Sequence, residues 1–181
     1  MLLHLDKHKL LPYLQSAYRA HHFTETAVLK VLSDILMAIN KGDLAMLVML
    51  DLLAAFDSVD QSILLRRLHI SYGLDSTVLQ WFSSYLDHRT QFVRCASSTS
   101  TPSFIECGLL QGSVLGTILF LLYTADLVNL VKSYDLNPHF YVDDTQIYGF
   151  SQPATTDELQ SRVCVSAFLA VASISCQQSL W

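Results

Sequence analysis

One continuous apolar run constrains the fold of this chain more than any other feature. Residues 44–50 (LAMLVML) are all hydrophobic, follow a Gly42-Asp43 turn and end directly at Asp51. A run of this length predicts a β-strand, and its unbroken apolar character is typical of a strand covered on both faces. The rest of the chain can supply that cover, because 51% of its 181 residues are hydrophobic and only 15% are charged. This composition excludes a disordered tail and predicts one packed core.

Five segments have the apolar spacing of amphipathic or buried helices. In the first, Thr24 is suited to cap a helix whose apolar residues recur every three or four positions until Gly42. Asp60 and then Asp75 or Ser76 are suited to start the next two, and Thr156 or Asp157 the last. The predicted helices cover about residues 24–41, 60–73, 75–86, 113–131 and 156–173.

Two further segments predict β-hairpins. Strand-like runs at Arg89–Ala96 and Phe104–Cys107 flank a polar turn at Ser97–Ser103. A second pair of β-rich runs, Asn137–Val142 and Thr145–Phe150, has Asp143 and Asp144 between its strands. Helices interleaved with antiparallel hairpins indicate an α+β fold, with helices packed on one face of an antiparallel sheet.

Charge, cysteine spacing and hydropathy restrict the functional classes. The net charge of -5 leaves the protein as a whole without a basic footprint for nucleic acid. The most apolar stretch, Val114–Ala125, and a second one, Val163–Cys176, are both shorter than the roughly 20 residues of a membrane span, so no membrane partner is expected. The four scattered cysteines and the absence of a signal-peptide pattern predict an intracellular protein, nuclear or cytoplasmic, that is not secreted.

Three aspartates are the candidate catalytic groups. Asp51 ends the predicted buried strand, and Asp143 and Asp144 lie in the predicted hairpin turn, with no Lys or Arg within seven positions of Asp143. A buried carboxylate needs a counter-charge, and Mg²⁺ is a natural one because it prefers oxygen ligands. Two such ions, about 3.5–4 Å apart, could assist displacement at phosphorus. From spacing alone, ordinary turn and cap aspartates remain an equal alternative.

Three segments resemble, in chain order, motifs A, B and C of reverse transcriptases, and two upstream segments resemble the fingers of non-LTR (LINE-type) retrotransposon polymerases. The motif segments are VMLDLLAAFD (residues 48–57), GLLQGSVLG (108–116) and FYVDD (140–144), and the upstream segments are QSAYR (15–19) and TETA (24–27). The resemblance implies a polymerase palm with partial fingers over residues 1–150, followed by a divergent C-terminal helix over residues 151–181.

The resemblance also implies an activity and its partners. Asp51 and Asp143 would hold two Mg²⁺ ions, with Mn²⁺ as a substitute, and Asp144 would be a weaker ligand or an electrostatic partner. The reaction would be RNA-directed DNA synthesis, which adds deoxynucleotides from their triphosphates to the 3′-hydroxyl of a DNA primer on an RNA template. Positioned metal ions would supply most of the chemistry of this phosphoryl transfer.

Five further residues match substrate-binding positions of the family, each with a plainer alternative. Phe56 would block a ribose 2′-hydroxyl; alternatively, it is an aromatic residue of the core. Gln111 and Gly112 would pack beside the template and the incoming nucleotide; alternatively, they only connect a strand to a helix. Arg19 would grip the triphosphate, or is a solvated surface residue. Tyr141 would lie next to the primer end, or is a strand residue that alternates with Val142.

Departures from the family pattern leave the activity of this chain open. Leu110 and Thr117 replace usual prolines, Leu53 stands where serine is common, and no lysine follows Lys132 to match the family's motif D. A thumb would need residues beyond Trp181 or a partner chain. Three hypotheses follow: a reverse transcriptase fragment that extends a primer weakly, a noncatalytic remnant that acts as a binding protein, and, least favoured, a metal-dependent phosphohydrolase or nuclease.

Overall fold

The structure of the chain is a computed structural model that describes residues 5, 7, 8, 10, 23–51 and 55–174. Its contacts divide these residues into two compact units. The first, called here the sheet unit, contains the described residues up to Ala55 together with Thr124–Ile174. The second, called the hairpin unit, is Phe56–Tyr123. Each unit is described by itself.

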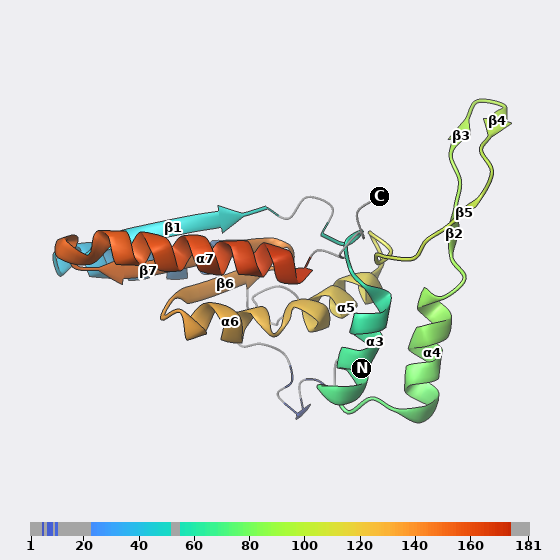
Figure 1. Ribbon diagram of the computed structural model, residues 1–181, viewed down its shortest axis with the longest axis horizontal. Helices are drawn as coiled ribbons and strands as arrows, with labels where there is room; N and C mark the ends of the chain where they lie inside the picture. Colours follow the sequence, from blue (N-terminus) through green and yellow to red (C-terminus); the bar gives the residue numbers. More distant parts are fainter. Residues whose placement is uncertain (1–4, 6, 9, 11–22, 52–54, 175–181) are drawn as a thin grey trace. The chain divides into compact units, whose positions relative to one another are not determined.

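The sheet unit is built on three antiparallel strands in the order β1-β7-β6 (Figure 1). Strand β1 (Leu44–Leu50) pairs along its whole length with β7 (Asp144–Ser151), from Leu44 opposite Ser151 to Leu50 opposite Thr145. Strand β6 (Asn137–Tyr141) pairs with the other edge of β7. The predicted hairpin of β6 and β7 is therefore present, and it supplies the central strand.

Strand β1 lies at an edge of this sheet. The strand is less buried than its unbroken apolar sequence predicted, since 72% of Met49 and 45% of Leu44 are exposed. The apolar run does form a strand, but within the described residues β1 pairs with β7 alone. The apolar run thus predicted the strand correctly and its burial incorrectly, because burial depends on neighbouring elements that the run itself does not specify.

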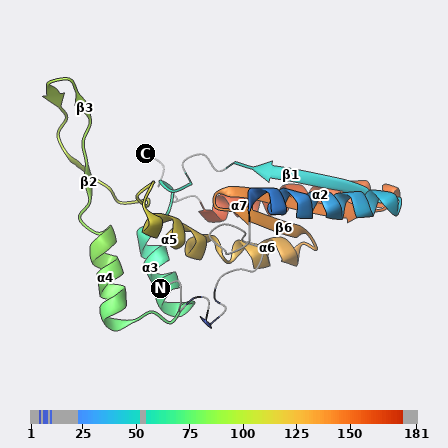
Figure 2. The ribbon, with the colours of Figure 1, turned by 180° about the vertical axis from the view of Figure 1, so that it is seen from behind.

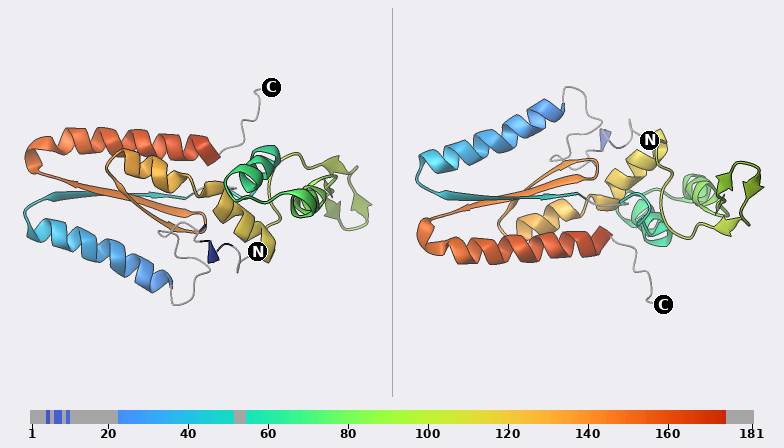
Figure 3. Two further views of the ribbon diagram at one scale, coloured as in Figure 1. Left: turned by 90° about the horizontal axis from the view of Figure 1, so that it is seen from below. Right: turned by 90° about the horizontal axis from the view of Figure 1, so that it is seen from above.

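Helices cover both faces of the sheet (Figures 2 and 3). Helix α7 (Thr156–Ile174) lies against β7 and β1, and α6 (Leu127–Ser133) lies beside it against β6. Helix α2 (Thr24–Asn40) lies on the opposite face, against β1 and β6. The prediction of an α+β fold with an antiparallel sheet is confirmed. The prediction that the helices pack on one face of the sheet is wrong, because α2 covers the face opposite to α6 and α7. Helix α7 packs on the sheet and belongs to the same unit as the strands. The predicted domain boundary between residues 150 and 151 stays a prediction.

Helix α2 begins one residue earlier than the predicted cap implies. Phe23 is the capping residue; its N–H donates to Thr26 Oγ1 at 3.0 Å, and the Thr26 hydroxyl donates to the Phe23 carbonyl at 2.7 Å. The helix ends at Asn40, two residues before Gly42, whose φ of 89° lies in the left-handed region. Tyr148 of β7 donates a 2.7 Å hydrogen bond to Asp34, which ties α2 to the central strand.

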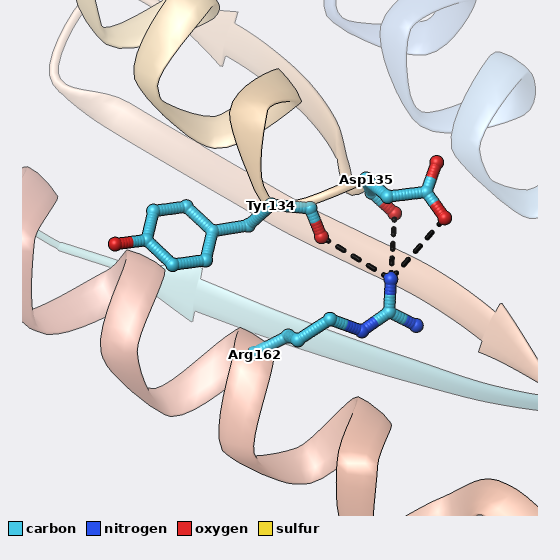
Figure 4. Close-up of polar contacts among 3 residues, drawn as sticks. All are labelled: Tyr134, Asp135 and Arg162. Carbon is cyan, nitrogen blue, oxygen red and sulfur yellow. Dashed lines mark hydrogen bonds and ion pairs between the residues drawn. The ribbon is translucent and has the colours of Figure 1, made fainter.

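Arg162 joins α7 to the end of α6 (Figure 4). Its Nη1 donates to the carbonyl oxygens of Tyr134 and Asp135 at 3.2 and 3.4 Å and to the Asp135 carboxylate at 3.2 Å. The Asp135 side chain is 98% exposed, so this ion pair contributes little. The carbonyl contacts matter more, because carbonyls that follow a helix lack partners within it.

One side chain in the apolar stripe of α7 is polar. The stripe lies at helical spacing and is formed by Leu159, Val163, Ser166, Ala170 and Ile174. Ser166 is fully buried, and its hydroxyl has no hydrogen-bond partner among the described residues. We expect Ser166→Ala to raise the free energy of unfolding by about 1 kcal/mol, because an unpaired buried hydroxyl is costly.

Urea unfolding followed by circular dichroism measures this gain. Ser173→Ala is the matched control, since it makes the same replacement on the same helix at an exposed site whose hydroxyl already donates to the Leu169 carbonyl. The control accounts for the helix preference of alanine. Equal changes for the two variants would show that the unpaired hydroxyl of Ser166 carries no cost.

The hairpin unit contains α3 (Gln61–Ile70), α4 (Ser76–Leu86) and most of α5 (Val114–Thr124). The predicted cap at Asp60 is confirmed: its Oδ1 accepts from the Ile63 N–H at 2.9 Å and from the Ser62 hydroxyl at 2.6 Å. These bonds satisfy a free donor of the first helical turn. Helix α4 also starts as predicted, after Asp75.

The hairpin between α4 and α5 differs from its prediction. It consists of two short ladders, β2 (Thr90–Gln91) with β5 (Ser103–Phe104) and β3 (Arg94–Cys95) with β4 (Ser98–Thr99). The predicted turn at Ser97–Ser103 is wrong, since the chain reverses at Ala96-Ser97 and residues 98–99 pair as a strand. Ala96 adopts a φ of 52°, which permits the short reversal without the glycine that a sequence pattern would signal.

The single helix predicted over about residues 113–131 is two helices, α5 and α6, separated by Ala125 and Asp126. The apolar region is longer than the predicted stretch Val114–Ala125: an 18-residue window within Val114–Ser133 has a mean hydropathy of 1.9, which by length and composition alone would suffice to cross a membrane. Two thirds of that window (67%) is buried within the structure, as in the core helix of a globular fold.

Candidate active site at the end of the sheet

The register of the sheet brings the three candidate aspartates to one end. Leu50 pairs with Thr145, so Asp51 follows directly beyond the ladder, beside the first residue of β7, Asp144. On the other edge of β7, Tyr141 pairs with Asp144, and Asp143 lies in the loop between them. All three carboxylates therefore belong to the sheet unit and extend from neighbouring strand ends.

The hairpin that presents Asp143 turns one residue earlier in the chain than predicted. Only Val142 and Asp143 form the loop, and Asp144, predicted to lie in the turn, is the first residue of β7. Val142 has a φ of 58°, which is unusual for a β-branched side chain. Such backbone strain costs on the order of 1–3 kcal/mol and persists where neighbouring structure enforces it. The two strands thus fix Asp143 at the tip of a strained turn.

The carboxylates lie nearer to water than the sequence implied. Asp51 and Asp144 are exposed and Asp143 is half-buried, so the prediction of a buried strand end is wrong. Partial desolvation raises the pKa of Asp144 above its ordinary value of 3.8, and the nearby charges of Asp143 and Asp51 raise it further. Within the described part of the chain, no hydrogen bond or ion pair includes these three side chains. No cationic side chain among the residues that the structure describes therefore offsets their mutual repulsion.

The donor chemistry of these residues suits a hard divalent cation, although the carboxylates do not form a complete binding group by themselves. Among the described residues, no set of three or more His, Cys, Asp or Glu side chains is placed so that it could hold a metal ion. Magnesium sites in phosphoryl-transfer proteins commonly use one or two carboxylates and take their other ligands from phosphate and water. The residues present thus fit a cation whose ligand shell is completed by a nucleotide.

The raised pKa of Asp144 predicts how stability depends on pH. Because the pKa of Asp144 is higher in the folded state, the folded state keeps the proton up to a higher pH than the unfolded state does. The free energy of unfolding therefore falls as the pH rises from about 3.8 through the raised pKa. Asp144→Asn removes this effect. We expect the variant to have a higher urea midpoint than the wild type at pH 7 and an equal midpoint at pH 3, where both side chains are neutral.

Adding MgCl₂ at pH 7 extends this comparison. A cation bound by the carboxylates would stabilise the wild type more than the variant and narrow the difference in midpoint. Asp157→Asn, which replaces an exposed carboxylate in the first turn of α7, is the control for the cation and should show no such dependence on Mg²⁺. A midpoint difference that is the same at pH 3 and pH 7 would contradict the charge repulsion inferred for Asp144.

The other predicted site residues lie in the hairpin unit or outside the described residues. Phe56 is half-buried and stacks on Phe120, with ring centroids 4.8 Å apart. Gln111 and Gly112 are exposed in the loop before α5, and Gly112 has a φ of 77°. Arg19 lies outside the described residues. The structure therefore brings Tyr141 together with the three aspartates in one unit and places Phe56, Gln111 and Gly112 in the other.

Ser113 is a positioning residue that the sequence analysis missed. Its hydroxyl accepts from the Gly116 N–H at 2.9 Å and donates to the Leu110 carbonyl at 2.8 Å, which joins the Gln111-Gly112 loop to the start of α5. A Cβ at Gly116 would lie 2.5 Å from the Leu110 oxygen, so glycine is required there. The signal was present in the sequence, since serine three residues before a helical position is a common capping pattern.

Sequence comparison identifies the family. The sequence profile described as "Reverse transcriptase (RNA-dependent DNA polymerase)" matches residues 1–175. The chain belongs to the reverse transcriptase family. The predicted assignment from the three motifs and the fingers segments is therefore confirmed, including its retrotransposon character, since the relatives described below come from transposable elements.

Two curated Drosophila proteins illustrate the relationship. A probable RNA-directed DNA polymerase from transposon BS of Drosophila melanogaster is 32% identical over 131 residues, which cover 68% of this chain and 13% of that protein. One from transposon X-element of the same species is 30% identical over 162 residues, 90% of this chain and 16% of that protein. This reverse transcriptase chain thus spans about a seventh of the length of these relatives.

A solved structure shows the same fold. An apo telomerase from Candida tropicalis, truncated from its C-terminal domain, matches 97% of this chain and 37% of its own chain, with a TM-score of 0.63 and 15% sequence identity. At this level of identity the match concerns the fold alone. It confirms the predicted palm-like architecture of the reverse transcriptase chain.

Proposed function

We propose that this chain is a palm-type core for RNA-directed DNA synthesis, which transfers deoxynucleotides to the 3′-hydroxyl of a DNA primer on an RNA template. The observation that carries the proposal is the convergence of Asp51, Asp143 and Asp144 at one end of the sheet in a member of the reverse transcriptase family. The partial fingers motif and the motif B loop occur in the order that the family requires.

Asp51 and Asp143 would hold the divalent cations. When bound, two Mg²⁺ or Mn²⁺ ions would activate the primer hydroxyl and offset charge on the phosphates. The protein's own part is placement: β1 fixes Asp51, the strained turn at Val142 fixes Asp143, and Asp144 adds negative charge that attracts the cation. Tyr141, paired with Asp144, would border the primer end.

The remaining residues would select and align the substrates. Phe56 would exclude a ribose 2′-hydroxyl, and its stacking on Phe120 supports this proposal because it holds the ring in one orientation. Gln111 and Gly112 would lie beside the template and incoming nucleotide, on the loop that Ser113 braces. Arg19 would contact the triphosphate, since a guanidinium is suited to phosphate oxygens. We place the protein inside the cell, in the nucleus or cytoplasm, with further chain or a partner chain as the thumb.

Primer extension tests the proposed function. The chain is incubated with a labelled DNA primer annealed to an RNA template, deoxynucleoside triphosphates and Mg²⁺ or Mn²⁺, in parallel with Asp143→Ala. We expect weak, poorly processive extension by the wild type, because few cationic residues are available to hold the duplex. Extension should be absent with the variant or with EDTA. Equal incorporation by wild type and Asp143→Ala would refute the proposal.

A noncatalytic binding role is the second candidate, and exposed apolar side chains favour it. Val165, Phe168 and Val171 of α7 are 46%, 73% and 39% exposed. Surfaces of this kind on a soluble domain commonly mark contacts with another protein. A complex or oligomer in gel filtration, together with dye binding and no primer extension, would support this role. A monomer that binds no hydrophobic dye would contradict it.

A further inference from the structure

The hairpin between α4 and α5 has a charge pattern unlike the rest of the chain. Residues 88–105 contain Arg89 and Arg94 and no Asp or Glu, whereas the whole chain has a net charge of -5. The same segment is rich in hydroxyl side chains, and Arg94 is exposed. These hydroxyl residues are Thr90, Ser97, Ser98, Thr99, Ser100, Thr101 and Ser103. Arginine, serine and threonine are the side chains that contact phosphate oxygens in nucleic-acid complexes.

A ladder of stacked side chains leads into this hairpin from α4. The rings of Trp81 and Tyr85 are 5.9 Å apart and inclined by only 9°, and the Arg89 guanidinium lies 5.4 Å from the centroid of the Tyr85 ring. The four-residue spacing places the three side chains along one side of the helix and its end. Trp81 is 54% exposed, so the ladder ends in an aromatic ring open to solvent. An exposed aromatic ring is a surface on which a planar base can stack.

Two more aromatic rings on the hairpin are open to solvent. Phe104 and Phe92 are 72% and 58% exposed. Phe104 pairs across the hairpin with Thr90, and the Arg89 carbonyl accepts from the Ile105 N–H at 2.8 Å, so Phe104 lies close to the end of the ladder. Since exposed phenylalanines bring no benefit to folding, their presence beside arginine suggests binding.

A cavity of about 620 Å³ lies at the base of the hairpin. Arg89 and Phe104 both line it, with His88, Asp87 and Glu106 among the other lining residues. The Asp87 carboxylate already pairs with His88 at 2.8 Å. The cavity therefore combines the Arg89 guanidinium, the Phe104 ring and the Glu106 carboxylate, and this carboxylate can accept hydrogen bonds from amino groups of bases. Its volume is within the range of small-ligand sites.

We propose that this hairpin surface, formed by Trp81, Tyr85, Arg89, Phe92, Arg94 and Phe104, binds single-stranded RNA. Unpaired bases stack on the exposed rings and enter the cavity beside Arg89, while Arg94 and the hydroxyl groups contact the phosphates. The proposal rests on the proposed function, because it assigns a site for the unpaired part of an RNA template. A duplex would bind weakly, since its bases are not free to stack on the rings.

Fluorescence anisotropy of a labelled 12-nucleotide single-stranded RNA tests the site, in EDTA and without nucleotides. We expect Phe92→Ala/Phe104→Ala to weaken binding about tenfold through lost stacking. Phe92→Tyr/Phe104→Tyr should retain wild-type affinity. Arg89→Gln/Arg94→Gln should weaken binding about tenfold and reduce the slope of log K against log salt by about 0.7, as for the one phosphate contact made by Arg94.

Two controls keep the result specific. Phe168→Ala removes an equally exposed ring from α7 in the sheet unit and should leave RNA affinity unchanged. In a Trp181→Phe background Trp81 is the only tryptophan, and RNA should quench its fluorescence if bases stack at the end of the ladder. The proposal is overturned if the Phe92→Ala/Phe104→Ala variant, folded by circular dichroism, binds within twofold of wild type. Equal affinity for duplex RNA, or no RNA binding by the wild type, overturns it as well.

The same variants separate this proposal from the proposed polymerase activity. Asp143→Ala should bind the single-stranded RNA like the wild type, because EDTA removes any cation at the carboxylates. RNA binding without primer extension would therefore refute only the polymerase function. Primer extension that survives in the Phe92→Ala/Phe104→Ala variant, with unchanged RNA affinity, would refute only the hairpin site.

Discussion

Asp51→Asn is expected to lower the rate of primer extension by about 10³-fold without lowering stability. A cation that assists displacement at phosphorus contributes several kcal/mol to the transition state, and each 1.36 kcal/mol is a tenfold change in rate. Asp51 follows β1 directly, beside Asp144, and no hydrogen bond among the described residues depends on its side chain. Removing its charge weakens the repulsion on Asp144, so stability should stay equal or rise.

Single-nucleotide incorporation in Mg²⁺ measures the loss, and urea unfolding of the same preparation measures stability. Asp157→Asn is again the matched control: it removes an exposed carboxylate from the sheet unit at the start of α7 and should extend the primer at the wild-type rate. Wild-type incorporation by Asp51→Asn would show that this aspartate is a turn residue rather than a ligand. A parallel loss in Asp157→Asn would point to a general effect of charge.

Gly108→Ala should destabilise the hairpin unit by about 3 kcal/mol. Gly108 has a φ of 94°, and a Cβ there would lie 2.9 Å from the Asp57 Cα and 3.1 Å from the Asp57 carbonyl oxygen. Backbone atoms cannot rotate away as a side chain can. A left-handed residue with a Cβ costs about 1 kcal/mol, and overpacking adds about 2 kcal/mol. The neighbouring Gly108 N–H to Val59 oxygen bond, at 2.7 Å, would be strained as well.

Gly73→Ala separates the two causes. Gly73 also has a positive φ, 63°, but nothing lies within 4 Å of the added Cβ, so only the cost of about 1 kcal/mol is expected. Trp81 belongs to the same unit, and its fluorescence during urea unfolding in the Trp181→Phe background reports on both variants. Equal losses for the two variants would mean that the loop before Gln111 yields to the added methyl group.

Local patterns in the sequence predicted most elements well. Helices α3, α4 and α7 begin and end close to the predicted residues, and the Asp60 cap has the expected hydrogen bond. The hairpin of β6 and β7 was also predicted. Helical spacing, capping residues and apolar alternation act between residues that are close in the sequence, so the local sequence is sufficient to predict these elements.

Predictions that required knowledge of neighbours failed. Strand β1 was expected to be buried and is partly exposed, and Asp51 was expected to be buried and is exposed. The reversal at Ala96-Ser97 and the loop at Val142-Asp143 both use a positive φ at a residue other than glycine, which no turn pattern would signal. Such conformations are enforced by the strands on either side and not preferred by the residues themselves.

The sequence alone determined the reverse transcriptase motifs, the chain order of the helices and strands, and the residue types of the candidate site, because each of these is a local property. Only the tertiary structure decided that β1 pairs with β7 in the register that sets Asp51 beside Asp144, and that aromatic rings and arginines gather at the hairpin between α4 and α5. Pairing between segments far apart in the chain depends on how all the elements pack together, and a local sequence pattern does not specify it.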